Sequence, residues 1–455
     1  MEVTCVRLQA GQRVIVMGLA KSGEAVARLL LRQGVNVIVN DQKDPDAKNT
    51  AVRELRDLGA EFVFGGHPLS LLDFHPDFIV KNPGIPYSVP LLQEAKRLAV
   101  PIYTEIEVSS WLMKSPLFAI TGSNGKTTTT TLIGQILDHA GQNPVVAGNI
   151  GRVLSGVIED VAPHQPVVLE VSSFQLMGTE SLHPKIAVLL NLYPAHLDYH
   201  KTFDNYAAAK MRLFQNMTAE DTAVLNYDQP QIRTRAERVM ASIVWFSQST
   251  VLTKGVWVEN SQIVADVGMG RMEIISVSDL GLPHNLENTL AAVAVALLAG
   301  TAPSVIADVL SSFSGVEHRM ELVARVHDVT FYNDSKATNP QAALRALQSF
   351  DQNVIWIGGG LDRGDDYAVL QDAIQGRVKA AVLLGQSAAR LEQVCSQSGI
   401  AQVKLVSSIE EAVAAAALAA APGDVVLLSP ACASWDMFNS FEERGSMFKQ
   451  AVHRL

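Results

Sequence analysis

The feature that most constrains this chain is a glycine-rich loop between an apolar strand and a threonine-rich helix. Residues 117–121 predict the strand, and the sequence TGSNGKT at 121–127 continues into a helix predicted over 127–140. Glycines let successive backbone N–H groups converge on a phosphate, and a helix N-terminus and a lysine add positive charge. The full eight-residue phosphate-loop pattern needs glycine where this chain has Ile120, so the match is to a shorter variant.

We therefore predict a nucleotide site in this loop, in preference to a plain glycine turn with a surface lysine. The Lys126 amine suits the outer phosphates, and the Thr127 hydroxyl suits Mg²⁺. The residues predicted to bind ATP here are Gly122, Ser123, Asn124, Gly125, Lys126, Thr127 and Thr128.

Short β-rich runs alternate with helical patterns along most of the 455 residues, which predicts an α/β protein with parallel sheets covered by helices. New units open near residues 113 and 315, so we expect domains at 1–113, 114–315 and 316–455. Short alternating runs over 241–277 predict a small antiparallel sheet beside the parallel sheet of the central domain.

Composition argues against several classes of protein. The formal charge of −10, with no basic tract, disfavours nucleic acid as a partner. The longest apolar runs, 290–299 and 412–421, are about half the length of a membrane span and predict buried helices, so no membrane insertion is expected. The three cysteines, Cys5, Cys395 and Cys432, are widely spaced, which favours a reducing, cytoplasmic location.

A second glycine loop, at 18–23, follows the first predicted strand. Asp41 ends the next strand, 18 residues after Gly23, as in a dinucleotide-binding fingerprint. Ala20 replaces the middle glycine that would let the backbone approach a pyrophosphate, which argues against NAD. A turn without a ligand and a site for a diphosphate-sugar nucleotide both remain compatible with this loop.

Several polar residues follow strands of the central region. Glu170 ends an apolar strand, where a second metal ligand beside a phosphate loop is expected. His196 and Asp198 follow another strand, Lys210 lies in a predicted helix, and Asn149 lies in a loop. Considered singly, such a histidine is more often structural and such a lysine more often faces solvent.

The C-terminal region carries two polar runs after predicted strands. Residues 333–339 follow one strand, and 429–434 follow another. Arg319 would neutralise phosphate oxygens, and Asp334 would hold a ribose or an amine. A capped strand–helix junction without a ligand explains either run equally well when it is considered alone.

Taken together, these motifs resemble those of the Mur ligases. The resemblance rests on TGSNGKT at 121–127, Glu170 in LEVSSFQL, the pair 318–319, NDSKAT at 333–338 and SPACASWDMFNSFEERG at 429–445. The last segment is similar to the branch of the family that adds D-glutamate. The resemblance implies three domains: a Rossmann-like N-terminal domain, a central phosphate-loop ATPase domain, and a Rossmann-like C-terminal domain that binds D-glutamate and closes on ATP.

The implied activity is ATP-dependent ligation of D-glutamate to UDP-N-acetylmuramoyl-L-alanine, in cytoplasmic peptidoglycan precursor synthesis. It would proceed through an acyl phosphate and a tetrahedral intermediate and release ADP and phosphate. The implied cofactors are ATP and two Mg²⁺ ions, the partners are these small-molecule substrates, and the chain is expected to be a monomer.

The resemblance also implies roles for individual residues. The implied catalytic residues are Lys126, His196, Lys210 and Arg319, with His196 one candidate for the base that deprotonates the amine. The implied metal ligands are Thr127, Glu170, His196 and a carbamylated Lys210. The remaining implied contacts are Asn288, Arg319 and Asp334 for ATP; Ser22, Asp41, Gly84 and Asn149 for the UDP-linked substrate; and Lys336, Thr338, Arg363, Ser434 and Phe441 for D-glutamate.

Two positions depart from the family pattern, and two other readings stay open. Ala195 stands where many relatives have an acidic residue, and Arg363 stands where some have lysine. One alternative is a ligase similar to folylpolyglutamate synthetase, which needs no UDP pocket. The other is a phosphate-loop switch that hydrolyses ATP slowly without forming a bond.

Overall fold

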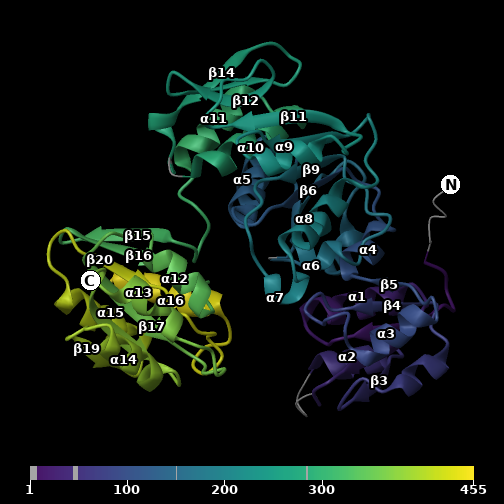
Figure 1. Cartoon of the computed structure of the whole chain (residues 1–455), viewed down its shortest axis with the longest axis horizontal. Coiled ribbons are helices and arrows are strands. Elements are labelled where there is room, and N and C mark those ends of the chain that lie inside the picture. The colour runs from purple at the N-terminus through teal and green to yellow at the C-terminus, as the bar shows by residue number, and fades with distance from the viewer. Residues whose placement is uncertain (1–7, 45–49, 150, 283–284) are drawn as a thin grey trace. The chain divides into compact units, whose positions relative to one another are not determined.

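The structure, a computed structural model, falls into two compact units that we describe separately (Figure 1). The first unit is Met1–Phe313 and the second is Ser314–Leu455. The residues that the structure describes are 8–44, 50–149, 151–282 and 285–455. Cys5 lies outside them, and Cys395 and Cys432 are buried free thiols. Among the described residues, no helix is both long and apolar enough to cross a bilayer.

The first unit begins with a five-stranded parallel sheet in the order β3-β2-β1-β4-β5. Its strands and helices are β1 (Arg13–Met17), α1 (Lys21–Arg32), β2 (Asn36–Asp41), α2 (Thr50–Asp57), β3 (Glu61–Phe64), β4 (Phe78–Lys81), α3 (Pro90–Arg97) and β5 (Ile102–Tyr103). The chain leaves β1 towards β2 and later returns to β4 on the other side of β1. A crevice at the carboxyl ends of β1 and β4 is the usual place for a ligand in such a sheet.

A nine-stranded sheet forms the rest of the first unit, in the order β14-β13-β12-β11-β10-β9-β6-β8-β7. The strands are β6 (Leu117–Thr121), β7 (Val145–Gly148), β8 (Val167–Glu170), β9 (Ile186–Leu189), β10 (Thr222–Asn226), β11 (Ser242–Ser247), β12 (Gly255–Glu259), β13 (Gln262–Asp266) and β14 (Met272–Ser276). The helices are α5 (Lys126–His139), α6 (Ser173–Leu176), α7 (Leu197–His200), α8 (Phe203–Met211), α9 (Pro230–Ala236), α10 (Leu286–Leu298) and α11 (Pro303–Ser312). Strand β6 lies between β8 and β9 and is parallel to both, so its carboxyl end lies beside theirs.

The α/β fold class is confirmed, with one difference in the stretch 241–277. Only β12, β13 and β14 are antiparallel, while β11 pairs in parallel with both β10 and β12. These strands extend the parallel sheet instead of forming a separate one beside it. Alternating polarity reveals that one face of a strand is buried, but it does not reveal which neighbour the strand pairs with.

Helix α4 (Glu105–Ser110) joins the two sheets of the first unit. The buried Glu107 carboxylate accepts hydrogen bonds from the backbone N–H groups of Glu180, Ser181 and Leu182, at 2.8–3.1 Å. Glu105 accepts one from the N–H of Ser155 at 2.6 Å, and burial raises the pKa of Glu105. These bonds explain why both sheets belong to one compact unit. The three-domain partition at 113 and 315 stays a prediction.

The second unit contains a six-stranded sheet in the order β15-β16-β20-β17-β18-β19. Strand β15 is antiparallel to β16, and the other pairs are parallel. The strands are β15 (Glu321–Val326), β16 (Val329–Asn333), β17 (Val354–Gly359), β18 (Val378–Leu384), β19 (Val403–Leu405) and β20 (Val425–Leu428). The helices are α12 (Pro340–Leu347), α13 (Gln371–Ile374), α14 (Ala388–Gln397), α15 (Ile409–Ala419) and α16 (Phe441–Val452). Both polar runs predicted from the sequence follow neighbouring strands, β16 and β20.

Candidate functional site

The loop between β6 and α5 has the backbone that the phosphate-loop pattern predicts. Gly125 is left-handed (φ 79°), and a Cβ placed on it would lie 2.0 Å from Oδ1 of Asn288. A Cβ on Gly122 would lie 2.9 Å from the Cβ of Leu190. Neither position has room for a larger side chain, so the backbone itself forms the surface that a ligand would meet.

Asn191, which was not predicted as a site residue, follows β9 and holds this loop. Its backbone oxygen accepts from the N–H of Ser123 at 3.0 Å, and its side-chain oxygen accepts from the N–H of Asn124 at 2.8 Å. Its amide nitrogen donates to Glu287, whose pKa burial raises. The only sequence signal for this role is a polar residue at the carboxyl end of an apolar strand.

The hydroxyl of Ser123 connects the loop to two further segments. It donates to the backbone oxygen of Tyr193 at 3.0 Å and accepts from the Tyr206 hydroxyl on α8 at 2.9 Å. The segment after β9 and the Tyr206 side chain of α8 therefore fix the loop, in addition to its own two glycines.

Two lysines donate to the same backbone oxygen, that of Gly122. Nζ of Lys126 lies 2.9 Å from it, and Nζ of Lys210 lies 2.7 Å from it. Lys210 is buried, 4.8 Å above the ring of Tyr206. Burial lowers the pKa of Lys210 well below that of an ordinary lysine, the charge of Lys126 lowers it further, and Glu170 opposes both effects. The neutral amine of Lys210 is thus favoured far more than in an exposed lysine.

The structure brings Glu170, Thr127 and Asn149 together. Glu170 is buried at the end of β8; its Oε2 accepts from the Thr127 hydroxyl at 2.9 Å, and its Oε1 accepts from the Asn149 amide at 2.9 Å. Asn149 was expected to contact the UDP-linked substrate, and here its side chain orients the Glu170 carboxylate. Hydroxyl and carboxylate oxygens are ligands that suit Mg²⁺.

No cluster of three or more His, Cys, Asp or Glu side chains suited to a metal occurs in the part of the chain that the structure describes. His196, expected as a metal ligand, is exposed and left-handed (φ 54°) at the start of α7, with its ring 4.9 Å from that of Phe174. The buried histidine of this segment is His200, whose Nε2 lies 3.0 Å from the Ser173 hydroxyl. The side chain of Asp198 lies outside the described part.

The crevice of the first sheet contains a cavity of about 250 Å³. Its lining residues are Gly18, Ala20, Asp41, Gln42, Lys43, His67, Asn82 and Ile85. Asn82 joins two of the predicted substrate residues: its amide donates to the Ser22 hydroxyl at 3.2 Å, and its oxygen accepts from the Gly84 N–H at 3.2 Å. Asp41 accepts from the N–H of Leu19 at 2.6 Å. Asp41 thus lines the cavity itself, and Ser22 and Gly84 are hydrogen-bonded to Asn82 of its lining.

Lys81, at the end of β4, was not predicted, yet it is buried beneath this crevice. Its Nζ donates to the backbone oxygens of Asn82, at 3.3 Å, and Pro83, at 3.1 Å, and lies 4.6 Å from the ring centre of Tyr87. Burial lowers the pKa of Lys81 to about 8. The lysine therefore fixes the path of the loop that carries Gly84.

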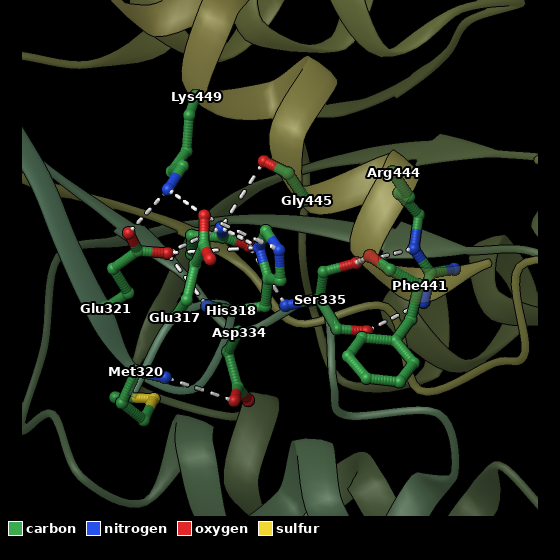
Figure 2. Close-up of polar contacts among 11 residues, drawn as sticks. Glu317, His318, Met320, Glu321, Asp334, Ser335, Phe441, Arg444, Gly445 and Lys449 are labelled. Atoms are coloured by element: carbon green, nitrogen blue, oxygen red, sulfur yellow. Dashed lines mark hydrogen bonds and ion pairs between the residues drawn. The ribbon is translucent and has the colours of Figure 1, made fainter. Parts of the chain in front are cut away.

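In the second unit, His318 is held in a network drawn in Figure 2. It is buried and left-handed (φ 63°), and its Nδ1 accepts from the Asn333 amide at 2.9 Å. A Cβ on Gly445 would lie 2.3 Å from that nitrogen, so α16 can approach only because residue 445 is glycine. Burial lowers the pKa of His318, although Glu317 and Glu321 oppose the shift. The network fixes the backbone that presents Arg319.

Asp334 and Arg319 differ sharply in exposure. Asp334 is buried after β16, where it accepts from the N–H of Met320 at 3.3 Å (Figure 2). It also accepts from the Ser429 hydroxyl at 2.9 Å. Burial raises the pKa of Asp334 to about 6 against these bonds and the nearby positive charges of Arg319 and Arg345. Arg319 is exposed.

Arg444 ties three strand ends together and was not predicted as a site residue. Its guanidinium is buried and donates to the hydroxyl and carbonyl oxygens of Ser335, at 3.0 and 2.9 Å, and to the backbone oxygen of Cys432 at 3.1 Å. A further bond reaches the Gly359 oxygen at 3.4 Å. Burial lowers the pKa of Arg444 to about 10. Its position inside the polar segment 429–445 was visible in the sequence, but its burial was not.

The residues predicted for D-glutamate lie in two groups. Lys336 places its ammonium 5.6 Å from the ring centre of Phe441. Arg363 stacks on Trp435 instead, 4.6 Å from the ring centre, and both are exposed. Ser434 is buried, and Thr338 is half-buried after Lys336. The structure thus brings Lys336 and Phe441 together and gives Arg363 an aromatic partner.

Family comparisons cover most of the chain. The Mur ligase MurD-like N-terminal domain matches residues 12–104, the Mur ligase middle domain matches 120–296, and the Mur ligase glutamate ligase domain matches 318–432.

Two relatives carry the name UDP-N-acetylmuramoylalanine--D-glutamate ligase. The protein from Geobacillus kaustophilus is 47% identical over 99% of both chains. The protein from Bacillus subtilis is 46% identical over 98% of both chains. Among solved structures, the UDP-N-acetylmuramate-alanine ligase MurC of Thermotoga maritima aligns with a TM-score of 0.54 at 19% identity, over 97% of this chain and 99% of that one. The MurF ligase of Thermotoga maritima in complex with ADP gives 0.52 at 18% identity, over all of both chains. At these identities the structural matches establish the fold alone.

Proposed function

This chain belongs to the Mur ligase family, and on that premise we propose how its residues divide one reaction among them. The chain is an ATP-dependent ligase of peptidoglycan precursor synthesis that joins D-glutamate to UDP-N-acetylmuramoyl-L-alanine through an amide bond. The observation that carries the residue-level proposal is the phosphate loop after β6, with Lys126, Thr127 and the buried Glu170 converging beside it.

The reaction needs ATP because a carboxylate is a poor electrophile. The γ-phosphoryl group is transferred to the L-alanyl carboxylate, which gives an acyl phosphate and ADP. The neutral amine of D-glutamate then attacks the acyl carbon and loses a proton, and the tetrahedral intermediate expels phosphate. Two anions meet in the first step, so positioning and neutralisation of charge dominate catalysis.

The phosphate loop binds the triphosphate of ATP. Backbone N–H groups of residues 122–127 and the N-terminus of α5 face the phosphates, and Asn288 lies by the adenine. The ammonium of Lys126 exchanges its bonds to the oxygens of Gly122 and Ser123 for bonds to the outer phosphates. Because these bonds hold Lys126 at the loop, its ammonium is already close to the phosphate site before the nucleotide binds.

Mg²⁺ suits the oxygens gathered at Glu170. The Thr127 hydroxyl and the Glu170 carboxylate lie 2.9 Å apart and are both hard oxygen donors, so they fit this ion. When bound with ATP, Mg²⁺ neutralises charge on the phosphates. Asn149 keeps the carboxylate oriented through its bond to the second oxygen.

Lys210 is the candidate for carbamylation. Addition of CO₂ to its neutral amine forms an N–C bond and releases one proton, giving a carbamate with one negative charge. The depressed pKa of Lys210 favours the reactive neutral amine. A carbamate here would add oxygen ligands for a second Mg²⁺ and would relieve the repulsion from Lys126. We assign His196 to the same ion, and its ring lies 6.4 Å from that of Tyr206.

The remaining substrates have separate regions. Asp41 lines the cavity proposed for the UDP group, and Ser22 and Gly84 bond to Asn82 in its lining. In the second unit, Lys336, Thr338, Ser434 and Phe441 bind D-glutamate, and Arg363 contributes a charge for its carboxylates. Arg319 neutralises negative charge on the phosphoryl group during its transfer, and Asp334 contacts ATP. His196 is the candidate base for the amine. We place the enzyme in the cytoplasm as a monomer.

An amino-acid panel tests this function. Phosphate release is measured with ATP, Mg²⁺ and UDP-N-acetylmuramoyl-L-alanine, while the added amino acid is varied among D-glutamate, L-glutamate, D-aspartate and L-alanine. We expect release that depends on both D-glutamate and the acceptor. Release without either would favour a slow phosphate-loop ATPase. Stabilisation of the protein by a folate but not by the UDP acceptor would favour a ligase similar to folylpolyglutamate synthetase.

A further inference from the structure

The first unit contains a further cavity, separate from the one at the carboxyl ends of β1 and β4. It has a volume of about 620 Å³ and lies between α8, the turn after it and α9. Its lining includes Asp204, Ala208, Met211, Phe214, Arg235 and Arg238. None of its lining residues in the described part of the chain is among those proposed for ATP, the UDP acceptor or D-glutamate. A cavity of this volume accommodates a small organic molecule.

The lining combines an apolar floor with positive charge. Met211, Phe214 and Val239 supply apolar surface. Arg235 lies in the last turn of α9, and Arg238 lies two residues beyond the end of this helix. The acidic residue of the lining is Asp204, which accepts from Arg235 at 2.7 Å and has a side chain that is 86% exposed. A carboxylate so exposed can turn into solvent, because surface ion pairs contribute little.

This chemistry defines the ligand class. An aromatic or aliphatic group would cover Met211 and Phe214, while a single carboxylate, sulfonate or phosphate would take the place of Asp204 on Arg235. Arg238, which is exposed, supplies the second cation. We propose that the cavity binds a small amphiphilic anion and that its occupancy changes the affinity of the phosphate loop for nucleotide.

The coupling follows from the geometry of α8. Residues 204, 208 and 211 share one face of the helix, and 206 and 210 share another, because positions two apart differ by about 200° around the axis. The first set lines the cavity. The second set meets the loop, through Tyr206 to the Ser123 hydroxyl and through Lys210 to the Gly122 oxygen.

Helix α9, on the opposite side of the cavity, is connected to the phosphate loop by a second set of hydrogen bonds. On α9, the Gln231 amide donates to the backbone oxygen of Leu192 at 3.0 Å. The preceding residue, Asn191, accepts from the N–H groups of Ser123 and Asn124. A ligand that changes the spacing of α8 and α9 therefore acts on both supports of the loop. Only the coupling half of this proposal rests on nucleotide binding at that loop.

The test uses anilinonaphthalene sulfonate, a fluorescent aromatic anion, with the full chain. We expect saturable binding that Ala208→Phe weakens at least tenfold, because the added ring fills the cavity. Ala414→Phe, at another exposed helical alanine, on α15, is the matched control and should bind as the unaltered chain does. Equal binding by these two variants would overturn the site.

Substitutions of charged residues test the same cavity if Ala208→Phe fails to fold. Arg238→Gln should weaken binding several-fold and Arg454→Gln should not, whereas Asp204→Asn should strengthen binding by removing the competing carboxylate. No difference between Arg238→Gln and Arg454→Gln would overturn the proposed anion contact.

Coupling is measured by titrating ADP with Mg²⁺ in the absence and presence of saturating probe. We expect at least a threefold change in ADP affinity, and the same factor in probe affinity when ADP is saturating, since binding linkage is reciprocal. Probe binding with an unchanged ADP affinity would overturn the coupling. Failure of ADP to bind under any condition would instead contradict the proposed function, and probe binding would still test the cavity.

Discussion

The phosphate loop of the first unit and the polar cluster of the second are built differently. In the first, the candidate functional side chains bond directly to one another and to the loop, as Thr127 does with Glu170 and Lys210 does with the Gly122 oxygen. In the second, buried residues such as Arg444 and Asn333 hold the backbone, while Arg319 and Arg363 extend into solvent. The first region thus gathers its side chains at the loop itself, and the second is a buried frame that carries exposed arginines.

This contrast predicts that substitutions in the first region alter chemistry more than stability. Replacing Lys126 by alanine should reduce kcat about a thousandfold, because it removes the cation placed for the outer phosphates. Phosphate release in the presence of D-glutamate measures the effect. Lys254→Ala, at an exposed lysine of the same unit, is the control and should stay near full activity. Retention of more than a few per cent of activity by Lys126→Ala would remove the phosphate-loop argument.

Lys210→Ala should reduce kcat about a hundredfold, and short carboxylic acids should partly restore it. The rescue is expected because a carbamate is chemically a tethered carboxylate, whereas a plain ammonium is not. Rates of Lys210→Ala measured with and without added acetate or formate give the result. If Lys126→Ala were rescued to the same extent, the effect would not report on a carbamate.

In the second region, the largest expected effects are on stability. Gly445→Ala should reduce the free energy of unfolding by about 1–3 kcal/mol, because the new Cβ would overlap the ring of His318. Denaturant unfolding followed by circular dichroism measures it. Gly156→Ala, whose Cβ would meet only the Ala25 side chain at 3.9 Å, should change stability much less. Equal losses in the two variants would show that the contact with His318 is not the cause.

The smallest predicted effect is a pH dependence from Asp334. Its pKa is about 6 in the folded chain and near 3.8 when unfolded, so the folded state takes up the proton first as the pH falls. The chain should therefore gain stability relative to Asp334→Asn as the pH drops from about 7 to about 5, on the order of 1 kcal/mol. Urea midpoints of both proteins across this range measure the difference. If the urea midpoints of the two proteins changed in parallel with pH, burial would not raise the pKa of the Asp334 carboxyl group.

The sequence predicted the parts of the fold and site that local patterns determine. The strand–loop–helix around Gly122 and Gly125, the strand ending at Glu170 and the run after β16 are continuous in the chain, and the structure contains them. These features depend on backbone conformation and on hydrophobic periodicity, which neighbouring residues largely decide.

What the sequence could not predict are contacts between distant segments. The bonds from Asn191 to residues 123–124, the burial of Arg444 beneath Ser335, and the role of Asn149 on Glu170 each join strand ends that only the sheet order brings together. The parallel pairing of β11 has the same origin. The sequence also contains no signal that tells which of the two histidines in this segment is buried. The structure buries His200 and leaves His196 exposed.

A crystal of the chain grown with ADP and Mg²⁺ tests the central claim most directly. We predict electron density for the diphosphate against the backbone N–H groups of residues 122–127, with the Lys126 ammonium turned from the Gly122 oxygen towards it. An empty loop, with ADP bound elsewhere on the molecule, would contradict it.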